Sequence, residues 1–458
     1  MTLRDQQINS QMEAVRGLYD GSSYYIETHG CQMNEHDSHK IATLLEEMGF
    51  QWAPEEEADF VLLNTCSVRH SAEDKVIGHI GRLKHEKEQR PHLKVGVCGC
   101  MMQRDESRNY VLSTFPHVDL VFGTNNIFEL PRLLLEMGEK KRAVSITDEY
   151  HTFDDQLMIG DRNSVREYVN IMYGCNNFCT YCIVPYTRGR ETSRPVGDIL
   201  EEVKLLGERG VKEIVLLGQN VNSYGKNLQE VVSFPELLRQ VHEVPGIERI
   251  QFLTSHPKDI SRELIDSYGD LPKLASYLHL PVQSGSNDVL KRMNRHYTRE
   301  QYLEIVAQVR RARPDIALST DIIVGFPGET EEDFQDTLDL VREVRYDSAF
   351  TFLYSRRSGT KADTMEDQID QDVKNERFQR LLEVVYAIQK EKNEALFGTT
   401  QQVLFESVSK KDATRMTGRT SGYKLVHAPY DETALGKIVP VRIEGGNTFS
   451  LEGTVLHG

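Results

Sequence analysis

The sequence predicts an α/β protein of several domains: an N-terminal parallel βαβ domain, a partial (β/α)6 barrel and a small C-terminal antiparallel β-barrel. Three observations lead to this prediction. Short apolar runs alternate with helical periodicity as far as Tyr354, which is typical of parallel sheets. After residue 396 the pattern changes to short strands separated by turn residues. The 458 residues are also enough for three such domains.

The N-terminal domain is expected over residues 23–139, where strand and helix signals alternate. The strands are expected at 24–28, 60–64 and 93–97, and the helices at 35–48 and 71–85. Right-handed crossovers make such a sheet parallel, so ligands gather beyond the carboxyl ends of its strands. The polar residues 1–22 are expected to form a mobile arm, and the charged residues 140–163 a linker.

The barrel is expected over residues 164–396, with six strands. These strands are predicted at 168–172, 213–217, 249–253, 275–280, 317–324 and 349–354, with helices between them, for example at 234–244, 300–309 and 331–344. Active sites of such barrels lie at the carboxyl ends of the strands.

The C-terminal domain is expected over residues 397–458. Its strands are predicted at 403–408, 423–426, 438–443 and 451–455, with Gly445-Gly446-Asn447 as a tight turn. This pattern fits a small barrel of the kind that binds oligonucleotides.

Three cysteines in one short run, Cys175, Cys179 and Cys182, carry the strongest chemical signal in the chain. Thiolates select iron-sulfur clusters or zinc, and a structural zinc site normally closes with four ligands. Neither His242 nor His256 continues the run at the spacing of a zinc finger. Three cysteines on a 4Fe-4S cluster leave one iron open to a substrate or cofactor. A zinc site or plain structural thiols remain the alternative.

Three further cysteines each follow a predicted strand: Cys31, Cys66 and Cys100. They are expected at one edge of the parallel sheet, where they can converge on a second site. The alternative is that each is a small buried hydrophobic residue. Cys98 is expected to face away from Cys100 and to be structural. With seven cysteines, no secretory signal and no membrane-spanning run, the sequence predicts reduced cytoplasmic thiols that bind metals.

Nucleic-acid binding is not indicated by the overall charge, since 54 basic and 70 acidic residues give a net charge of −16. Local patches matter more, and from residue 398 onward seven basic residues face six acidic ones. Three basic runs are candidate phosphate contacts: Arg188, Arg190 and Arg194; Lys291, Arg292, Arg295, His296 and Arg299; and Lys410, Lys411, Arg415 and Arg419. Each run alone could be a solvated surface. Together they favour a nucleic-acid track whose affinity falls with salt.

The CxxxCxxC run, with Tyr181 before its last cysteine, resembles the radical S-adenosylmethionine superfamily. Two three-cysteine sites in this order resemble the methylthiotransferase family, and five blocks are closest to its tRNA-modifying branch: residues 28–34, 64–69, 99–101, 218–222 and 254–257. The C-terminal strands resemble the TRAM domain, an RNA-binding barrel.

This resemblance implies two 4Fe-4S clusters, one on Cys175, Cys179 and Cys182 and an auxiliary one on Cys31, Cys66 and Cys100. It implies S-adenosylmethionine as radical source and methyl donor. The expected cofactor contacts are Tyr181, Gln219, Asn220, Gln283, Ser284, Asp321 and Gly325. A turn at the end of a strand is the plain alternative for each block that contributes them.

The resemblance also implies a reaction and its partners. The expected reaction adds a methylthio group to carbon 2 of N6-isopentenyladenosine at position 37 of tRNA, with flavodoxin or ferredoxin as electron donor. The expected protein is monomeric and makes no membrane contact. The alternatives are a methylthiotransferase acting on threonylcarbamoyl-adenosine tRNA or on a ribosomal protein, and a non-enzymatic iron-sulfur RNA-binding protein.

Overall fold

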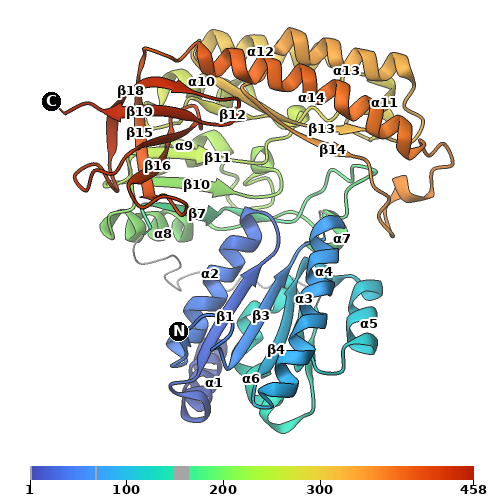
Figure 1. Ribbon diagram of the computed structural model, residues 1–458, viewed down its shortest axis with the longest axis vertical. Coiled ribbons are helices and arrows are strands. Elements are labelled where there is room, and N and C mark those ends of the chain that lie inside the picture. Colours follow the sequence, from blue (N-terminus) through green and yellow to red (C-terminus); the bar gives the residue numbers. More distant parts are fainter. Residues whose placement is uncertain (1–2, 68–69, 148–163, 458) are drawn as a thin grey trace. The chain divides into compact units, whose positions relative to one another are not determined.

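A computed structural model describes residues 3–67, 70–147 and 164–457, which divide into two compact units (Figure 1). The first unit comprises residues up to 161 with the short segments 173–176 and 182–192. The second comprises residues 162–172, 177–181 and 193–458. Among the described residues, no helix has the length and apolar character needed to cross a bilayer.

The first unit contains a six-stranded parallel sheet, as the alternation of strands and helices predicted. Its order is β2 (Gln51–Trp52), β1 (Ser23–Thr28), β3 (Phe60–Thr65), β4 (Lys94–Gly99), β5 (Leu120–Phe122) and β6 (Ala143–Ser145). The helices are α1 (Leu3–Tyr19), α2 (Gln32–Glu47), α3 (His70–Gln89), α4 (Cys100–Gln103), α5 (Asp105–Thr114), η1 (Thr124–Glu129) and α6 (Leu130–Glu139).

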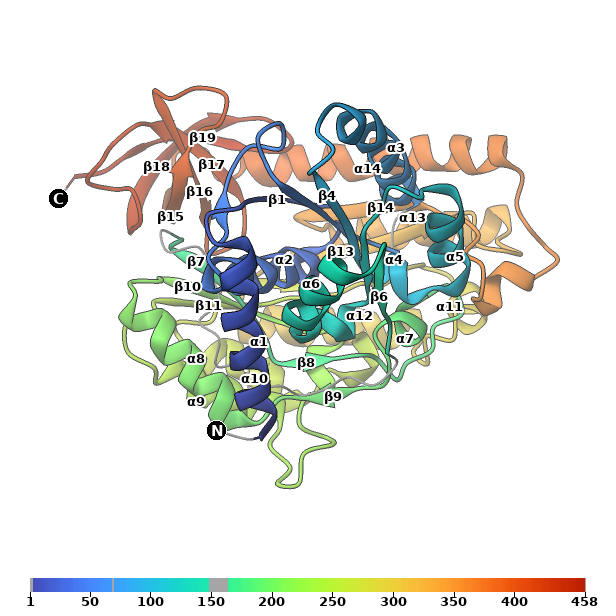
Figure 2. The same cartoon turned by 90° about the horizontal axis from the view of Figure 1, so that it is seen from below.

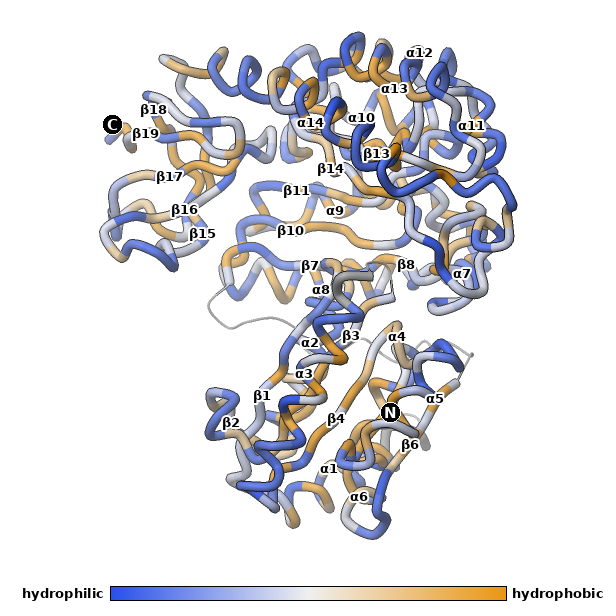
Figure 3. Tube along the Cα trace, turned by 45° about the vertical axis from the view of Figure 1, so that its right-hand side comes forward, coloured by the Kyte–Doolittle hydropathy of each residue, from blue (hydrophilic) through white to orange (hydrophobic). Residues whose placement is uncertain are grey.

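The central strands β3 and β4 are buried on both faces, which explains why their residues are mostly apolar (Figure 3). Phe60 and Leu62 of β3 pack with residues of α1, α2 and α6 on one face. Val61 and Leu63 pack with residues of α3 and α5 on the other. The alternation along β3 therefore fixes which helices cover which face.

Two expectations for the first unit are wrong. Residues 3–19 form the helix α1 rather than a mobile arm, and α1 lies beside α6 (Figure 2). Val15 is fully buried in the core, and Met12 and Tyr19 pack on the same cluster, so three apolar residues at helical spacing are enough to hold a polar helix. Residues 143–145 of the expected linker form the edge strand β6, while 148–163 lie outside the described residues.

The second unit contains the predicted partial barrel of six parallel strands. Three strands form one sheet in the order β11 (Arg249–Phe252), β10 (Glu213–Leu217), β7 (Arg166–Asn170). Three more form β12 (Tyr277–His279), β13 (Ala317–Val324), β14 (Ser348–Leu353). A parallel bridge between Ile250 and Leu274 connects the two sheets.

The longer helices of this unit are α8 (Val196–Glu208), α9 (Phe234–His242), α10 (Arg262–Asp270), α12 (Arg299–Ala312), α13 (Glu331–Val344) and α14 (Gln371–Glu394). Shorter elements are α11 (Asn287–Arg292), η2 (Val221–Ser223), η3 (Pro257–Asp259) and η4 (Lys361–Thr364). The segment around the CxxxCxxC run contains β8 (Met172–Tyr173), α7 (Val184–Thr187) and β9 (Thr192–Ser193).

The C-terminal residues form the expected closed barrel, with five strands where the sequence predicted four (Figure 1). Its order is β15 (Thr400–Val408), β16 (Arg415–Thr420), β17 (Leu425–Pro429), β19 (Leu451–Val455), β18 (Ile438–Gly446). One of its strand pairs, which joins Val426 to Leu451, is parallel rather than antiparallel. The sequence did not predict β16, because its inward residues are Met416, Gly418 and Thr420 rather than an apolar run. Gly445 and Gly446 do not form the expected turn: they continue β18 past a bulge, and the turn follows at Asn447.

A loop of the C-terminal barrel closes the amino-terminal end of the (β/α) barrel. Arg249, at the start of β11, donates hydrogen bonds to the carbonyls of Arg419 (3.1 Å) and Thr420 (3.4 Å). The ring of Tyr423 lies 4.9 Å from that of Tyr277, the first residue of β12. Lys424 donates to the carbonyl of Asp347, directly before β14. The two barrels of the second unit are therefore joined by direct contacts.

A buried carboxylate anchors this end of the barrel. Glu213 is 1% exposed and accepts hydrogen bonds from Arg166 (2.8 Å) and Arg249 (3.0 Å), which start the two neighbouring strands. Arg166 also donates to the hydroxyl of Tyr423 (2.9 Å). The same charge network therefore ties three strands to the C-terminal barrel.

We expect Glu213→Gln to lower the free energy of unfolding by about 3 to 5 kcal/mol, because it leaves two buried guanidinium groups without their carboxylate. Glu248→Gln is the matched control, since Glu248 pairs with Lys212 at the surface and should change stability by less than about 1 kcal/mol. Urea unfolding of the metal-free protein, followed by circular dichroism, measures both. Equal losses in the two variants would contradict the assigned role of Glu213.

Candidate functional site

Three cysteines lie at the carboxyl ends of adjacent strands in the first unit. Cys31 caps the amino terminus of α2 after β1, Cys66 follows β3, and Cys100 opens α4 directly after β4. Cys66 and Cys100 are buried, and Cys31 is partly exposed. Since β1, β3 and β4 are neighbours in the sheet, all three thiols lie at the edge where the sequence predicted them.

The electrostatics of Cys100 reflect this grouping. Burial raises its pKa to about 12, Arg188 opposes the rise, and the thiols of Cys66 and Cys31 add to it. At neutral pH, a buried thiol with this pKa loses its proton only when a metal ion binds to the sulfur in place of the proton. Among the described residues, no three His, Cys, Asp or Glu side chains are arranged to hold a single metal ion.

A turn at Gly99 separates Cys100 from Cys98. Residues two apart in a strand share a face, so alternation alone would not separate these cysteines. Gly99 has a φ of 96°, and a Cβ there would lie 2.5 Å from both the Asn64 side chain and the carbonyl oxygen of Thr65. The chain turns into α4 at this glycine. Cys98 consequently packs in the apolar core, as expected for a structural residue.

Arg188 does not lie on the surface as a phosphate contact. Its side chain is 7% exposed and forms an ion pair with Asp37 (2.9 Å). Its Nε donates to the sulfur of Cys100 (3.2 Å), and Asn34 accepts a longer bond from it (3.4 Å). The assignment of Arg188 to RNA binding is therefore wrong, since the guanidinium is occupied beside a candidate ligand.

The CxxxCxxC run is held by contacts within each unit. In the first unit, the amide of Cys175 donates to the carbonyl of Gly189 (3.1 Å). In the second, Asn294 donates to the carbonyl of Phe178 (3.0 Å), and Thr180 donates to the carbonyl of Arg292 (2.9 Å). The segment that follows α11 thus anchors the middle of the run.

Arg295 is the second arginine that faces a cysteine instead of RNA. It is 4% exposed, and its Nη1 donates to the sulfur of Cys179 (3.3 Å). Its other bonds go to the carbonyl of Pro281 (2.9 Å) and the hydroxyl of Tyr297 (3.1 Å). Tyr181 lies close to it as well, with its hydroxyl 3.5 Å from the same Nη1.

Three more arginines of the predicted basic runs are engaged within the fold. Arg194 is buried against Glu202 (2.7 Å), Arg419 contacts both oxygens of Glu406 (2.6 Å each), and Arg415 pairs with Glu452. A run of basic residues in sequence therefore does not make a basic surface here. The exposed members of the runs are Arg190, Lys291, Arg292, His296, Lys410 and Lys411.

Buried polar atoms without partners gather beyond β10 and β11. Asn220 is 1% exposed and donates to Asp259 (2.8 Å), yet its Oδ1 has no partner among the described residues. Ser255 Oγ and His256 Nε2, which follow β11, are in the same state. Buried polar atoms normally form hydrogen bonds, so this end of the barrel fits a polar ligand. Burial, with Arg295 second, lowers the pKa of His256 to about 2, which keeps its ring neutral.

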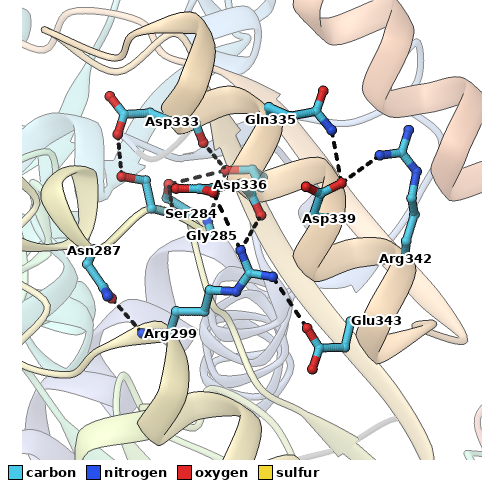
Figure 4. A network of polar contacts seen from close by, with 12 residues as sticks. Ser284, Gly285, Asn287, Arg299, Asp333, Gln335, Asp336, Asp339, Arg342 and Glu343 are labelled. Atoms are coloured by element: carbon cyan, nitrogen blue, oxygen red, sulfur yellow. Dashed lines mark hydrogen bonds and ion pairs between the residues drawn. The ribbon is translucent and has the colours of Figure 1, made fainter.

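The predicted cofactor residue Ser284 forms hydrogen bonds within the fold. Its hydroxyl lies 3.3 Å from that of Thr337 on α13, and it accepts from the amide of Ser286. Figure 4 shows this network, which continues through Asp333, Asp336 and Arg299. Ser284 therefore fixes the loop after β12. Gln283, at a φ of 71°, links that loop to β13 through backbone bonds with Asp321 and Ile323.

Gly325, another predicted cofactor residue, begins a turn that a buried acid stabilises. Gly325 has a φ of 74°, and its amide donates to Glu329 (3.0 Å). Glu329 also accepts from Arg377 (3.0 Å) and is 4% exposed. Burial raises the pKa of Glu329 to about 7, although the Gly325 amide and Arg377 act in the opposite direction. Sequence reasoning missed Glu329, which lies one residue beyond the Gly-Phe-Pro-Gly block.

An exposed aromatic face lies on the edge strand β14. Phe350 and Phe352 are 51% and 36% exposed, and they stand opposite Asp321 and Ile323 of β13. The alternate residues Ile322 and Val324 point to the other face and pack in the core with α13. Ile323 packs on the cluster that contains Tyr181 and Phe326. The aromatic face thus continues toward the cysteine run through Ile323.

We expect the stability of the folded protein to fall as pH rises from about 4.5 to about 7, because folded Glu329 keeps a proton that the unfolded chain loses. The loss amounts to at most about 3 kcal/mol and is complete above pH 7. Urea unfolding across this range should show a flatter profile for Glu329→Gln. Glu331→Gln, on a more exposed partner of Arg377, should keep the wild-type profile. An unchanged slope in Glu329→Gln would contradict the assignment.

Three family models match the chain. The radical SAM superfamily matches residues 169–341, the uncharacterized protein family UPF0004 matches 23–123, and the TRAM domain matches 395–456. Among solved structures, the radical S-adenosylmethionine methyltransferase TsrM from Kitasatospora setae has a TM-score of 0.54 at 14% identity, covering 75% of this chain and 77% of that chain. The cobalamin-dependent radical enzyme OxsB has a TM-score of 0.51 at 12% identity, covering 81% and 58%. At these identities the likeness shows the fold alone.

Curated relatives match nearly the whole chain. A tRNA-2-methylthio-N(6)-dimethylallyladenosine synthase of Acetivibrio thermocellus is 53% identical over 95% of this chain and 91% of the relative. A protein of the same name from Finegoldia magna is 54% identical over 95% and 94%. A Clostridium botulinum relative is 49% identical over 99% of both chains. The chain therefore belongs to the family of tRNA-2-methylthio-N(6)-dimethylallyladenosine synthases.

Proposed function

We propose that this protein is a radical S-adenosylmethionine enzyme that adds a methylthio group to carbon 2 of N6-dimethylallyladenosine at position 37 of tRNA. Two sets of three cysteines carry the proposal: Cys31, Cys66 and Cys100 follow neighbouring parallel strands, and Cys175, Cys179 and Cys182 lie in one short run. The names of the curated relatives supply the substrate. A carbon of an aromatic ring between two nitrogens resists mild ionic substitution, which explains the need for a radical.

Cys175, Cys179 and Cys182 would hold the 4Fe-4S cluster, which would supply the electron for reductive cleavage of S-adenosylmethionine. Polar contacts to this cofactor would come from the carboxyl ends of the barrel strands. Gln219 and Asn220 are the candidates after β10, and the unpartnered oxygen of Asn220 supports this assignment. Tyr181, Gln283, Asp321 and Gly325 are the remaining candidates.

Cys31, Cys66 and Cys100 would hold a second 4Fe-4S cluster that carries the sulfur to be inserted. The guanidinium of Arg188, which donates to the sulfur of Cys100, supports a buried thiolate ligand at this site. A second S-adenosylmethionine would donate the methyl group. An external donor of the flavodoxin or ferredoxin kind would supply the electrons, and the protein would act as a monomer.

The dimethylallyl-adenine would lie against the aromatic face of β14. Its ring is planar and its branched substituent is apolar, so Phe350 and Phe352 suit both parts. A base of a single-stranded anticodon loop leaves its stack at little cost. The tRNA backbone would be held by the exposed basic residues Arg190, Lys291, Arg292, Lys410 and Lys411.

We expect Cys179→Ser to abolish the cleavage of S-adenosylmethionine to 5′-deoxyadenosine by the reduced enzyme, because it removes a cluster ligand. Cys100→Ser should retain cleavage but give no methylthio product. Cys98→Ala is the matched control and should keep both activities. The measurement is anaerobic turnover with dimethylallyladenosine tRNA, followed by chromatography of the cofactor products and mass spectrometry of the nucleosides.

The same assay should include a threonylcarbamoyl-adenosine tRNA and the ribosomal protein. Product on either of these alone would assign the chain a different methylthiotransferase substrate. A reduced, cluster-loaded protein that never cleaves S-adenosylmethionine would contradict an enzymatic role.

We expect Phe350→Ser to raise KM for dimethylallyladenosine tRNA roughly 10-fold, since losing one base-stacking contact costs about 1 to 3 kcal/mol. Trp52→Ser, on the edge strand β2 of the first unit, also removes an exposed aromatic ring and should leave KM unchanged. Steady-state kinetics of both variants provide the test. Equal KM values for the Phe350 variant and the wild type would remove β14 from the substrate site.

A further inference from the structure

Two buried arginines each donate a hydrogen bond to a cysteine sulfur, one at each three-cysteine site. We propose that Arg295 raises the reduction potential of the cluster on the CxxxCxxC run, and that Asp37 cancels the same effect of Arg188 at the second site. Both arginines are thus positioning residues that act through the cluster ligands. The proposal rests on the proposed function, because it requires a cluster at each site.

The charge of Arg295 is not balanced by a carboxylate. Its three closest bonds go to the Cys179 sulfur, the Pro281 carbonyl and the Tyr297 hydroxyl. No carboxylate contacts it in the part of the chain that the structure describes. The ionisable groups that surround it are Tyr181, Tyr297, Cys179 and the neutral His256. Arg295 therefore places a full positive charge next to a cluster ligand.

The charge of Arg188 is balanced. Its Nη2 lies 2.9 Å from the carboxylate of Asp37, and both side chains are 7% exposed. The ion pair lies out of water, so solvent contributes little to its screening. Arg188 still donates its Nε proton to the Cys100 sulfur at 3.2 Å. The two sites therefore share a hydrogen bond to sulfur, and only the arginine at the second site is paired with a carboxylate.

This difference matters because reduction adds one negative charge to a cluster. In the proposed reaction a low-potential donor such as flavodoxin gives one electron to the cluster on the CxxxCxxC run, and no bond or proton is exchanged in that step. Hydrogen bonds to sulfur and nearby net charge both set the potential of such clusters. An unbalanced cation in a medium of low dielectric stabilises the added charge more than a neutral ion pair does. Arg295 thus favours reduction at the site that must cleave S-adenosylmethionine.

The test is a potentiometric titration of the reconstituted full-length protein, followed by electron paramagnetic resonance without S-adenosylmethionine or tRNA. Each cluster is measured alone, in a background where alanine replaces the three cysteines of the other site. Arg295→Gln removes the charge and keeps a hydrogen-bond donor, whereas Arg295→Lys keeps the charge. Asp37→Asn leaves Arg188 unbalanced. Arg194→Gln, at a buried arginine paired with Glu202, controls for the loss of any buried arginine.

We expect Arg295→Gln to shift the potential of the CxxxCxxC cluster to more negative values, with Arg295→Lys close to the wild type and Arg194→Gln without effect. Asp37→Asn should shift the second cluster to more positive values. The proposal is overturned if Arg295→Gln retains its iron and the wild-type potential, or if the Lys variant shifts as far as the Gln variant. An unchanged potential in Asp37→Asn overturns the part that concerns Arg188.

Iron analysis separates this proposal from the function itself. If Arg295→Gln loses its cluster, the proposal is tested by the potentials of Arg295→Lys and Asp37→Asn. Arg295→Lys should stay close to the wild type, and Asp37→Asn should shift to more positive values. A wild-type protein that binds iron only at the CxxxCxxC run would contradict the two-cluster function and the Asp37 part together. The Arg295 part would still be decided by its own titration.

Discussion

Parallel strands bring residues that are far apart in sequence to one edge of a sheet, and both candidate sites depend on this geometry. In the first unit, β1, β3 and β4 lie side by side, so Cys31, Cys66 and Cys100 end at one edge although 69 positions separate the outer two. In the second unit, the buried polar atoms without partners follow β10 and β11 in the same way. Neither sheet needs a special motif to create its site.

Arginine side chains are buried in both units. Arg166, Arg188, Arg194, Arg249 and Arg295 are all nearly inaccessible to solvent. Four of them face a carboxylate, which offsets the cost of removing a guanidinium from water. Arg295 has a sulfur, a carbonyl and a phenol instead. A buried guanidinium without a carboxylate is costly for stability, and strongly perturbed groups of this kind are common at functional sites.

The sequence was sufficient for most strands and for the placement of Cys31, Cys66 and Cys100 at strand ends, because these signals are local. A buried parallel strand is a short apolar run, and a cysteine spacing is read directly. Two of the elements that the sequence did not predict, α1 and β6, depend instead on distant residues. The helix α1 is polar over most of its length and depends on α6, which lies more than a hundred residues away. The strand β6 has three residues and is recognised only by its pairing with β5.

The arginines show more clearly what sequence-based prediction misses. Arg188, Arg190 and Arg194 look alike in sequence, yet the first faces Cys100, the second is exposed and the third pairs with Glu202. Nothing local distinguishes them, since the partner of each lies in another element. Ser284 is a similar case, because its partner Thr337 lies on α13.

The loop of residues 420–424 affects how truncations of the C-terminal barrel are interpreted. This loop contacts the first residues of β11 and β12 and the residue before β14, so it serves as the floor of the larger barrel. A chain shortened before residue 400 would expose the ring of Tyr277 and remove the carbonyl partners of Arg249. The domain is thus not an interchangeable module: a truncated chain that fails to modify RNA would report a damaged barrel as much as a lost RNA contact.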